Sequence, residues 1–300
     1  MIKPIISIGL ITYQHENYIH AAMEGILAQE GIESYEIVVG DDQSSDNTRK
    51  ILDQYATDHP NIRFLNRPSN VGMHRNWLDV IQACNGKYIA LIEGDDIWID
   101  SQKLKKQVDR LESDDTLSVC FSDASIINEM NDGTEYGTYL EHQDIDQNQT
   151  RFTIKDLFIQ NFISTCTVLL RNKVKWEVPK EYFESPYVDW LILILVAQDG
   201  DLASIPETCS TYRIHPTGAY GYSGQELRKR NMIKVLRCLF HCVRSESHKT
   251  LILDRYLLAV EELAQFIKSE SGKSTITFYW LKALRKLAQI NRSPIEPKLV

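Results

Sequence analysis

The sequence predicts an α/β fold with a mainly parallel sheet and helices on both faces. Short apolar runs alternate with stretches of helical periodicity through the first half of the chain, a pattern typical of right-handed strand–helix–strand units. Two of the apolar runs end abruptly in paired acidic residues, at the end of the strand where sheets of this class bind ligands. The chain has 300 residues, 43% of them hydrophobic, which is enough for a sizeable buried core.

The individual elements follow from this alternation. Strands are expected over residues 4–12, 35–40, 62–66 and 87–93, and helices over residues 17–30, 46–58 and 73–84. A further helix, with Leu104, Val108 and Leu111 on one face, follows the fourth strand. From residue 117 the pattern changes to strands over 117–127 and 164–170, an exposed polar loop over 128–150 and a buried helix within 187–200.

The acidic residues after the fourth strand are the most informative feature. Glu93, Asp95 and Asp96, with Gly94 between them, directly follow a continuous apolar run of the kind that forms a buried strand. Carboxylates at the carboxyl end of such a strand are hard oxygen ligands that divalent cations prefer. The alternative is an ordinary strand-to-helix turn, in which Gly and Asp are common.

A second strand end also carries paired acids. The apolar run 35–39 leads into Asp41 and Asp42. The pattern D-x-S-x-D from Asp42 is also that of a calcium loop, but Asn47 stands where that loop needs Gly, and Asp53 stands where a bidentate Glu is usual. Two acid-bearing strand ends therefore favour a ligand site over two unrelated turns.

Four motifs in order carry a family resemblance. They are ISIGLITYQHENYIH at residues 6–20, YEIVVGDDQSSDNT at 35–48, NVGMHRN at 70–76 and KYIALIEGDDIW at 87–98. Together they resemble the nucleotide-sugar half of family 2 glycosyltransferases, which have the GT-A fold. The resemblance implies a Rossmann-like, mainly parallel but mixed sheet in a domain over residues 1–220, with a nucleotide-sugar half at 1–125, an acceptor half at 126–220 and a helical region at 221–300.

The same resemblance implies roles for the two acid pairs. In the family the first pair binds the base and ribose of a nucleotide, usually uridine, which assigns Asp41 and Asp42 to the nucleotide. The second is the DXD-type motif that binds Mn²⁺ or Mg²⁺ on the diphosphate, which assigns Asp95 and Asp96 to the metal and Asp95 also to the nucleotide. Glu93 departs from the usual Asp at the first position of that motif.

Other positions match the family's nucleotide contacts. Thr12 and Tyr13 match its T-Y-N pattern, although Gln14 replaces the Asn, and an aromatic ring there can stack on a base. Arg75 matches an Arg-Asn pattern near the diphosphate, where the guanidinium fork suits phosphate or a uracil edge. His215 matches a His that several GT-A enzymes use as a further metal ligand; the alternative is a surface-loop residue.

Asp189 is the candidate catalytic base. The resemblance places an acidic residue before Trp at this point, where its carboxylate removes the proton of the acceptor hydroxyl. Val188 occupies the position where a second acid often stands, and Glu184 is the rival base nearby. The alternative is that Asp189 is the N-cap of the following helix, for which Asp is a favoured residue.

These roles together imply a metal-dependent, inverting glycosyltransferase, a UDP-sugar-using enzyme that acts on a glycan or lipid-linked acceptor in bacterial surface polysaccharide synthesis. A divalent cation stabilises the pyrophosphate leaving group, and a single displacement inverts the anomeric carbon. A nucleotidyltransferase or phosphotransferase is one alternative, although the sequence has no G-x-x-x-x-G-K-[ST] loop. A non-catalytic nucleotide-sugar-binding module is the other, and Asp189 argues against it.

Composition bears on partners and location. A net charge of −8 argues against nucleic-acid binding, and six scattered cysteines indicate a reducing cytoplasm. Cys238, His241 and Cys242 have zinc-like spacing, with core packing among neighbouring leucines as the alternative. Residues 273–300 carry six basic residues against one acid, and the segment 278–287 is basic and amphipathic. This segment is expected either to lie peripherally on the inner face of a membrane or to pack on the catalytic domain.

Overall fold

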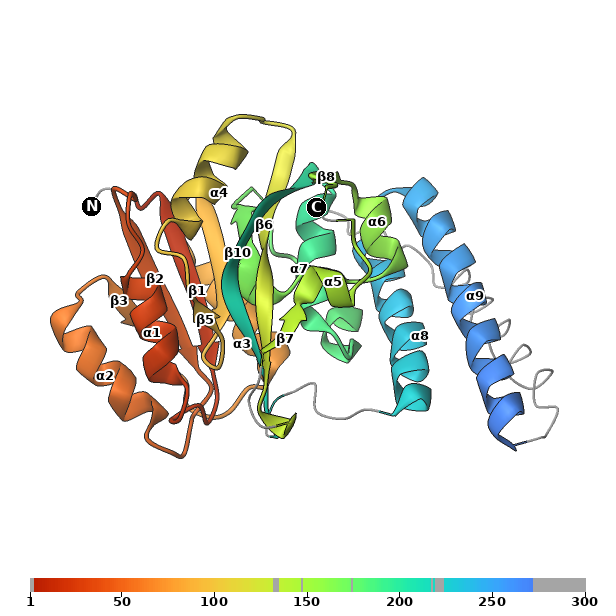
Figure 1. Ribbon diagram of the computed structural model, residues 1–300, viewed down its shortest axis with the longest axis horizontal. Coiled ribbons are helices and arrows are strands. Elements are labelled where there is room, and N and C mark those ends of the chain that lie inside the picture. The colour runs from red at the N-terminus through yellow and green to blue at the C-terminus, as the bar shows by residue number, and fades with distance from the viewer. Residues whose placement is uncertain are drawn as a thin grey trace, which may run out of the picture.

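A mixed sheet organises the protein. The computed structural model describes residues 3–271 apart from 132–134, 147, 174, 217 and 219–223. The strands of its ten-stranded sheet lie in the order β3-β2-β1-β4-β9-β6-β10-β5, with β7 paired to β6 and β8 paired to β10 (Figure 1). The predicted α/β class, with a mainly parallel but mixed sheet flanked by helices, is confirmed.

The first half contains the expected alternation of strands and helices. Its strands are β1 (Ile6–Thr12), β2 (Tyr35–Asp41), β3 (Ile62–Phe64) and β4 (Tyr88–Glu93), which pair in parallel. Its helices are α1 (Ile19–Leu27), α2 (Thr48–Asp58), α3 (Met73–Ala83) and α4 (Lys103–Glu112). The register pairs Thr12 with Asp41 and Ile11 with Glu93, so that three strands end at one edge of the sheet.

The two faces of the sheet have separate apolar cores because side chains alternate along each strand. Ile8 and Leu10 of β1 pack with α1, α2 and α4 in one cluster. Ile89 and Leu91 of β4 pack with α3 and the later helices in the other. Burial on both faces explains why these strands are continuous apolar runs in the sequence.

The second half extends the sheet by less regular connections. It comprises β5 (Ile97–Trp98), β6 (Leu117–Asn128), η1 (Glu129–Asn131), β7 (Glu135–Thr138), α5 (Tyr139–His142), β8 (Arg151–Phe152), α6 (Ile154–Ile159), η2 (Thr165–Thr167), β9 (Val168–Arg171), η3 (Lys180–Glu184), α7 (Val188–Ala197) and β10 (Asp201–Ile214). β10 runs parallel to β6, whereas β9 is antiparallel to both β4 and β6.

The predicted exposed loop over 128–150 is wrong in part. β7 pairs with β6 inside this segment, and α5 follows directly. Thr138 and Glu141 form a capping box, in which each side chain satisfies a backbone N–H of the first helical turn. Local capping therefore gives order to a segment whose polar composition is typical of a loop.

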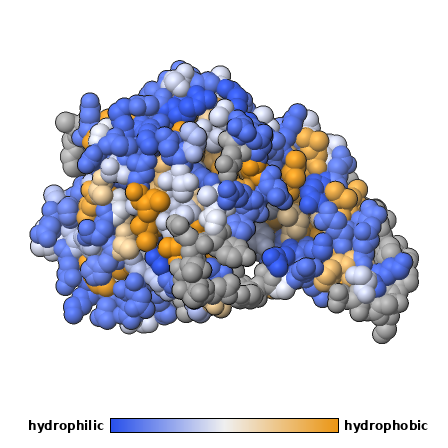
Figure 2. All heavy atoms as spheres, viewed as in Figure 1, coloured by the Kyte–Doolittle hydropathy of each residue, from blue (hydrophilic) through white to orange (hydrophobic). Residues whose placement is uncertain are grey.

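Two long helices, α8 (Gln225–Cys242) and α9 (Glu246–Ser271), follow the sheet and lie at the end of the molecule opposite β3 (Figure 1). Figure 2 shows hydrophobic patches among polar residues over these helices, where Leu227, Leu251 and Leu258 are exposed. Within the described ranges, no helix combines the length and the apolarity needed to cross a bilayer. The amphipathic segment 278–287 lies outside the described residues.

Gly25 of α1 provides a test of how closely this helix packs. A Cβ atom there would lie 2.5 Å from the carbonyl oxygen of Trp98, a backbone atom that cannot rotate away. We expect Gly25→Ala to destabilise the fold by about 1–3 kcal/mol, because overpacking outweighs the helix propensity that alanine adds. Gly224→Ala is the control, since no atom of the described residues outside its chain neighbours would lie within 4 Å of a Cβ there. Equal stability of both variants by urea denaturation would contradict the close packing.

Candidate active site

The site forms where the carboxyl ends of β1 and β4 meet the end of β10. His215, which follows β10, is 1% exposed, and its Nε2 lies 2.9 Å from Oδ2 of Asp95. Nε2 of His15, in the loop after β1, lies 3.7 Å from the same oxygen. Asp95 is thus flanked by two imidazoles, one of which comes from 120 residues away in the sequence.

Two groups of side chains share Asp95. The ligand atoms of His15, Asp95 and His215 lie within 4.8 Å of one another, and those of Glu93, Asp95 and Asp96 do so as well. The predicted ligands Asp95, Asp96 and His215 therefore lie in these two adjoining groups, with Asp95 common to both. These are the two metal-compatible groups in the part of the chain that the structure describes.

The electrostatics of these carboxylates differ according to their neighbours. Burial and the negative charges of Asp95 and Asp96 raise the pKa of Glu93 well above its usual value, and Asp189 contributes in the same direction. Burial and the charge of Asp95 likewise raise the pKa of Asp96. Burial opposes ionisation of Asp95 too, but the hydrogen bond from His215 and the charges of both imidazoles lower its pKa.

These features fit a divalent cation. Asp95 is only 8% exposed, and its buried Oδ1 has no hydrogen-bond partner among the described residues. A cation would provide a partner for that oxygen and reduce the repulsion that raises the pKa of Glu93 and Asp96. Burial lowers the pKa of His15 despite the opposing charge of Asp95, which favours the neutral imidazole that can bind a metal.

Arg213 of β10 forms hydrogen bonds with Asp95 and Asp96 of the segment 93–96, which we call the acid segment. Its backbone N–H donates to Oδ1 of Asp96 at 3.0 Å, and its Nε donates to the backbone oxygen of Asp95 at 3.0 Å. Its guanidinium also pairs with Glu129 at 2.6 Å and lies 5.1 Å from the ring centre of Tyr18. Sequence reasoning missed Arg213, since its partners are about 85 to 120 residues away and no local pattern marks it.

The first acid pair is held by neighbouring loops. Oδ1 and Oδ2 of Asp42 accept hydrogen bonds from the backbone N–H groups of Val71 and Gly72 at 2.7 and 2.8 Å. Oδ1 of Asp41 accepts from the Ser44 hydroxyl at 2.5 Å. Both acids are buried, and Asp42 connects the end of β2 to the loop before α3.

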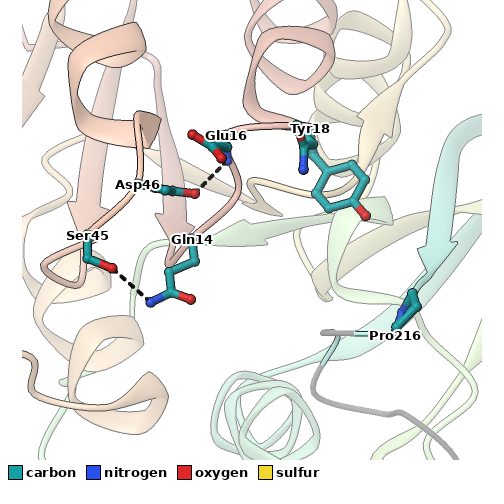
Figure 3. Close-up of a pocket in the computed structure, with 7 residues that line it drawn as sticks. Gln14, Glu16, Tyr18, Ser45, Asp46 and Pro216 are labelled. Carbon is teal, nitrogen blue, oxygen red and sulfur yellow. Dashed lines mark hydrogen bonds between the residues drawn. The ribbon is translucent and has the colours of Figure 1, made fainter.

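A pocket of about 410 Å³ opens beside these loops. Its lining residues are Gln14, Glu16, Asn17, Tyr18, Ser45, Asp46 and Pro216. Figure 3 shows Gln14 and Ser45 facing each other from the loops after β1 and β2, with Tyr18 and Pro216 across from them. Of the predicted nucleotide contacts, Thr12 is buried at the end of β1, whereas Tyr13 is 46% exposed beside the pocket-lining Gln14.

Arg75 lies away from the hydrogen bonds of Glu93, Asp95 and Asp96, which together form the acid cluster. Its Nε pairs with Oδ1 of Asp79 one turn along α3 at 2.7 Å, and its side chain is 55% exposed. The buried guanidinium of this region is instead that of Arg67, which donates to Oδ1 of Asn76 at 2.8 Å and also pairs with Asp79. Nothing in the local sequence distinguishes Arg67 from a surface arginine.

Asp189 lies in the first turn of α7, but it is not the N-cap. Tyr187 occupies the N-cap position, so the capping alternative for Asp189 is wrong. Nδ2 of Asn161 donates to Oδ2 of Asp189 at 2.7 Å, and the charge of Asp189 contributes to the raised pKa of Glu93. The rival base Glu184 is paired with Arg237 of α8.

The zinc alternative for α8 receives no support. Cys238, His241 and Cys242 form none of the metal-compatible groups found among the described residues. Cys238 and Cys242 are buried in the apolar core, and burial raises the pKa of their thiols to about 11 and about 12. Protonated thiols are poor zinc ligands, and both residues therefore act as core residues.

Comparison with known proteins agrees with this geometry. The model of glycosyl transferase family 2 matches residues 7–175, and the chain therefore belongs to that family. The chain is 34% identical over 228 residues to the uncharacterized protein Rv1520 of Mycobacterium tuberculosis, an alignment that covers 74% of this chain and 62% of that protein. The chain thus spans less than two thirds of the length of this relative.

Two solved structures share the fold. Residues 1–349 of TarS from S. aureus, in complex with UDP-GlcNAc, have a TM-score of 0.64 at 16% identity, over 93% of this chain and 79% of that one. The mannosyltransferase PcManGT of Pyrobaculum calidifontis, in complex with GDP-Man and Mn²⁺, has a TM-score of 0.57 at 14% identity, over 96% and 81%. These likenesses establish the GT-A fold of this chain, as the sequence predicted.

The two bonds of Asp42 lead to a stability prediction. A hydrogen bond to a charged group contributes about 1.5–3 kcal/mol, so Asp42→Ala should lower the free energy of unfolding by roughly 2–4 kcal/mol. Asp53→Ala is the control, because that carboxylate makes an exposed pair with Arg49 that contributes only about 0.2–0.5 kcal/mol. Urea denaturation measures both, and the idea that Asp42 holds the loop fails if the two losses are equal.

Proposed function

We propose that this protein transfers a sugar from a UDP-sugar to a hydroxyl group of a glycan or lipid-linked acceptor in surface polysaccharide synthesis, with inversion at the anomeric carbon. The observation that carries the proposal is the buried carboxylate of Asp95, flanked by two imidazoles at the edge where the strands end. The shared family, and the UDP-GlcNAc complex of a protein with the same fold, support a nucleotide-sugar donor.

The leaving group of this reaction explains the acid cluster. We propose that Asp95, together with Asp96 and His215, holds Mn²⁺ or Mg²⁺; when bound, such an ion stabilises the developing charge of the diphosphate as a Lewis acid. The Mn²⁺ in the complex of PcManGT supports this cofactor class. Arg213 keeps the backbone of Asp95 and the carboxylate of Asp96 in position through its own hydrogen bonds.

The nucleoside is proposed to bind along the ends of β1 and β2. Thr12 and Asp41 end these two strands, and the ring of Tyr13, which follows Thr12, is exposed for stacking on a base. Asp42 contributes by shaping the loop at Val71 and Gly72 as well as through the predicted nucleotide contact. Arg75 remains a proposed nucleotide contact that has to leave Asp79 in order to bind.

Asp189 is proposed as the general base. Asn161 fixes one of its carboxylate oxygens at 2.7 Å, so the carboxylate is oriented before an acceptor arrives. Its negative charge contributes to the raised pKa of Glu93, which supports a position near the acid cluster. A base on this side of the cluster can take the proton of an acceptor hydroxyl that attacks opposite the leaving group.

We also propose that the reaction takes place in the cytoplasm. All six cysteines are free thiols, which agrees with a reducing cytoplasm. Peripheral membrane contact through the segment 278–287 stays a prediction, since that segment lies outside the described residues.

Product analysis tests the reaction class. We expect incubation with a panel of sugar nucleotides and Mn²⁺ to release a nucleoside diphosphate from a UDP-sugar. Release of a sugar 1-phosphate, with transfer of the nucleoside monophosphate, would indicate a nucleotidyltransferase, and donor binding without any product would indicate a binding module. Either result would overturn the proposal.

Replacement of Asp95 tests the metal requirement. Asp95→Asn keeps the size of the side chain but removes the charge shared by both groups of ligands. We expect loss of the EDTA-sensitive release of nucleoside diphosphate, because the diphosphate loses its bridging cation. Asp109→Asn, an exposed carboxylate on α4, is the control. Full metal-dependent turnover by Asp95→Asn would rule out this metal site.

Replacement of Asp189 tests the base. Asp189→Asn removes proton acceptance with little change in shape, so donor binding should persist while transfer falls by about 10²- to 10⁴-fold. Glu184→Gln is the control, since Glu184 is paired with Arg237 and should affect transfer only mildly. Acceptor-dependent transfer rates measure both variants. If Glu184→Gln abolishes transfer and Asp189→Asn does not, the base has been assigned to the wrong carboxylate.

A further inference from the structure

His15 is a feature of the site to which neither the motif nor the proposed reaction gives a role. It lies in the loop between β1 and α1, next to the acid segment that follows β4. Its ligand atom lies within 4.8 Å of those of Asp95 and His215. Two imidazoles and one carboxylate in this arrangement are a donor set that transition metals bind.

The distances agree with a shared ion. Ligand atoms about 2.1 Å from one metal lie about 3.0 Å apart when they are neighbours in an octahedron, and about 3.4 Å apart in a tetrahedron. The separations from Oδ2 of Asp95 are 2.9 Å to Nε2 of His215 and 3.7 Å to Nε2 of His15. The first separation matches neighbouring positions of an octahedron, and the second exceeds the tetrahedral spacing by a few tenths of an ångström, while the ligand atoms of the two imidazoles lie within 4.8 Å of each other.

His15 is held in place independently of any ion. Its backbone N–H donates to the hydroxyl of Thr48 at 2.8 Å. Its backbone carbonyl accepts from the backbone N–H groups of Tyr18 and Ile19, each at 2.9 Å. Its Nδ1 is buried without a hydrogen-bond partner, and a Cβ on Gly94 would lie 2.9 Å from that atom. Gly94 therefore allows the acid segment to approach the imidazole closely.

Both histidines of this group adjoin residues that line the pocket. Gln14 and Glu16, which flank His15 in sequence, line the pocket, as does Pro216, which follows His215 (Figure 3). The ring centre of Tyr18, which also lines the pocket, lies 4.6 Å from that of His215. These neighbours place the group of His15, Asp95 and His215 next to the pocket.

We propose that His15 is a further ligand of the ion that Asp95, Asp96 and His215 are proposed to hold. The inference rests on the proposed function, in which the diphosphate of the donor occupies the remaining coordination positions. Imidazole nitrogens suit Mn²⁺, Co²⁺ and Zn²⁺, whereas Mg²⁺ prefers oxygen ligands. The site is therefore selective for a transition metal over Mg²⁺, and His15 contributes to that selectivity.

Pulsed electron paramagnetic resonance of bound Mn²⁺ counts the imidazole ligands directly. With Mn²⁺ and UDP, the unmodified protein should show two coordinated imidazole nitrogens, and His15→Gln should show one. Mn²⁺ affinity by calorimetry should fall in His15→Gln by at least the roughly 10- to 100-fold that loss of an outer-shell partner costs, while Mg²⁺ affinity changes little. His20→Gln is the matched control, because His20 is exposed on α1 and contacts Tyr55.

The outcomes separate this inference from the proposed function. A single imidazole nitrogen in the unmodified protein, with equal Mn²⁺ affinity in His15→Gln, overturns the role of His15 and leaves the Asp95 site intact. Absence of Mn²⁺ binding by the unmodified protein, even with UDP, overturns both. The melting temperature of metal-free His15→Gln should match that of the unmodified protein, since the contacts of His15 with Thr48, Tyr18 and Ile19 are made by its backbone. The number of imidazole nitrogens that bind Mn²⁺ in the unmodified protein can be measured without any variant, so this test does not depend on the folding of His15→Gln.

Discussion

The close approach of the carboxylates of Glu93, Asp95 and Asp96 is the constraint on which the rest of the site depends. Two like charges about 4 Å apart repel by about 4 kcal/mol at the effective dielectric constant of a partly buried site. Glu93, Asp95 and Asp96 bring three such groups together, and burial together with this repulsion raises the pKa of Glu93 and Asp96. The protein offsets it with the imidazole of His215 and with Arg213, and a cation would offset it further.

The topology places these opposing charges together. Parallel pairing ends β1, β2 and β4 at one edge, which positions the acids, and β10 then brings Arg213 and His215 to them from the second half of the chain. Asp189 reaches the same region from α7 and raises the pKa of Glu93. Strands of the first half of the chain and β10 of the second half therefore meet at the acid cluster.

Local patterns in the sequence account for much of this arrangement. Continuous apolar runs identified the buried strands, and acids at their ends identified the edge with the site, because both signals depend on neighbouring residues. His15 and Arg213 were missed because their partners come from distant strands and no periodicity marks them. The segment 128–150 was assigned as a loop because its polar composition concealed the capping box of Thr138 and Glu141. Tyr187 rather than Asp189 caps α7, a distinction that depends on backbone angles.

Reciprocal binding of metal and nucleotide tests the central claim most directly. If the ion lies between Asp95 and the diphosphate, Mn²⁺ must raise the affinity for UDP, and UDP must raise the affinity for Mn²⁺ by the same factor. Calorimetric titration of each ligand with and without the other measures both factors. We predict an equal increase of tenfold or more in both directions, which corresponds to a coupling free energy of about 1.4 kcal/mol or greater. Independent binding of the two ligands would contradict a shared site at the acid cluster.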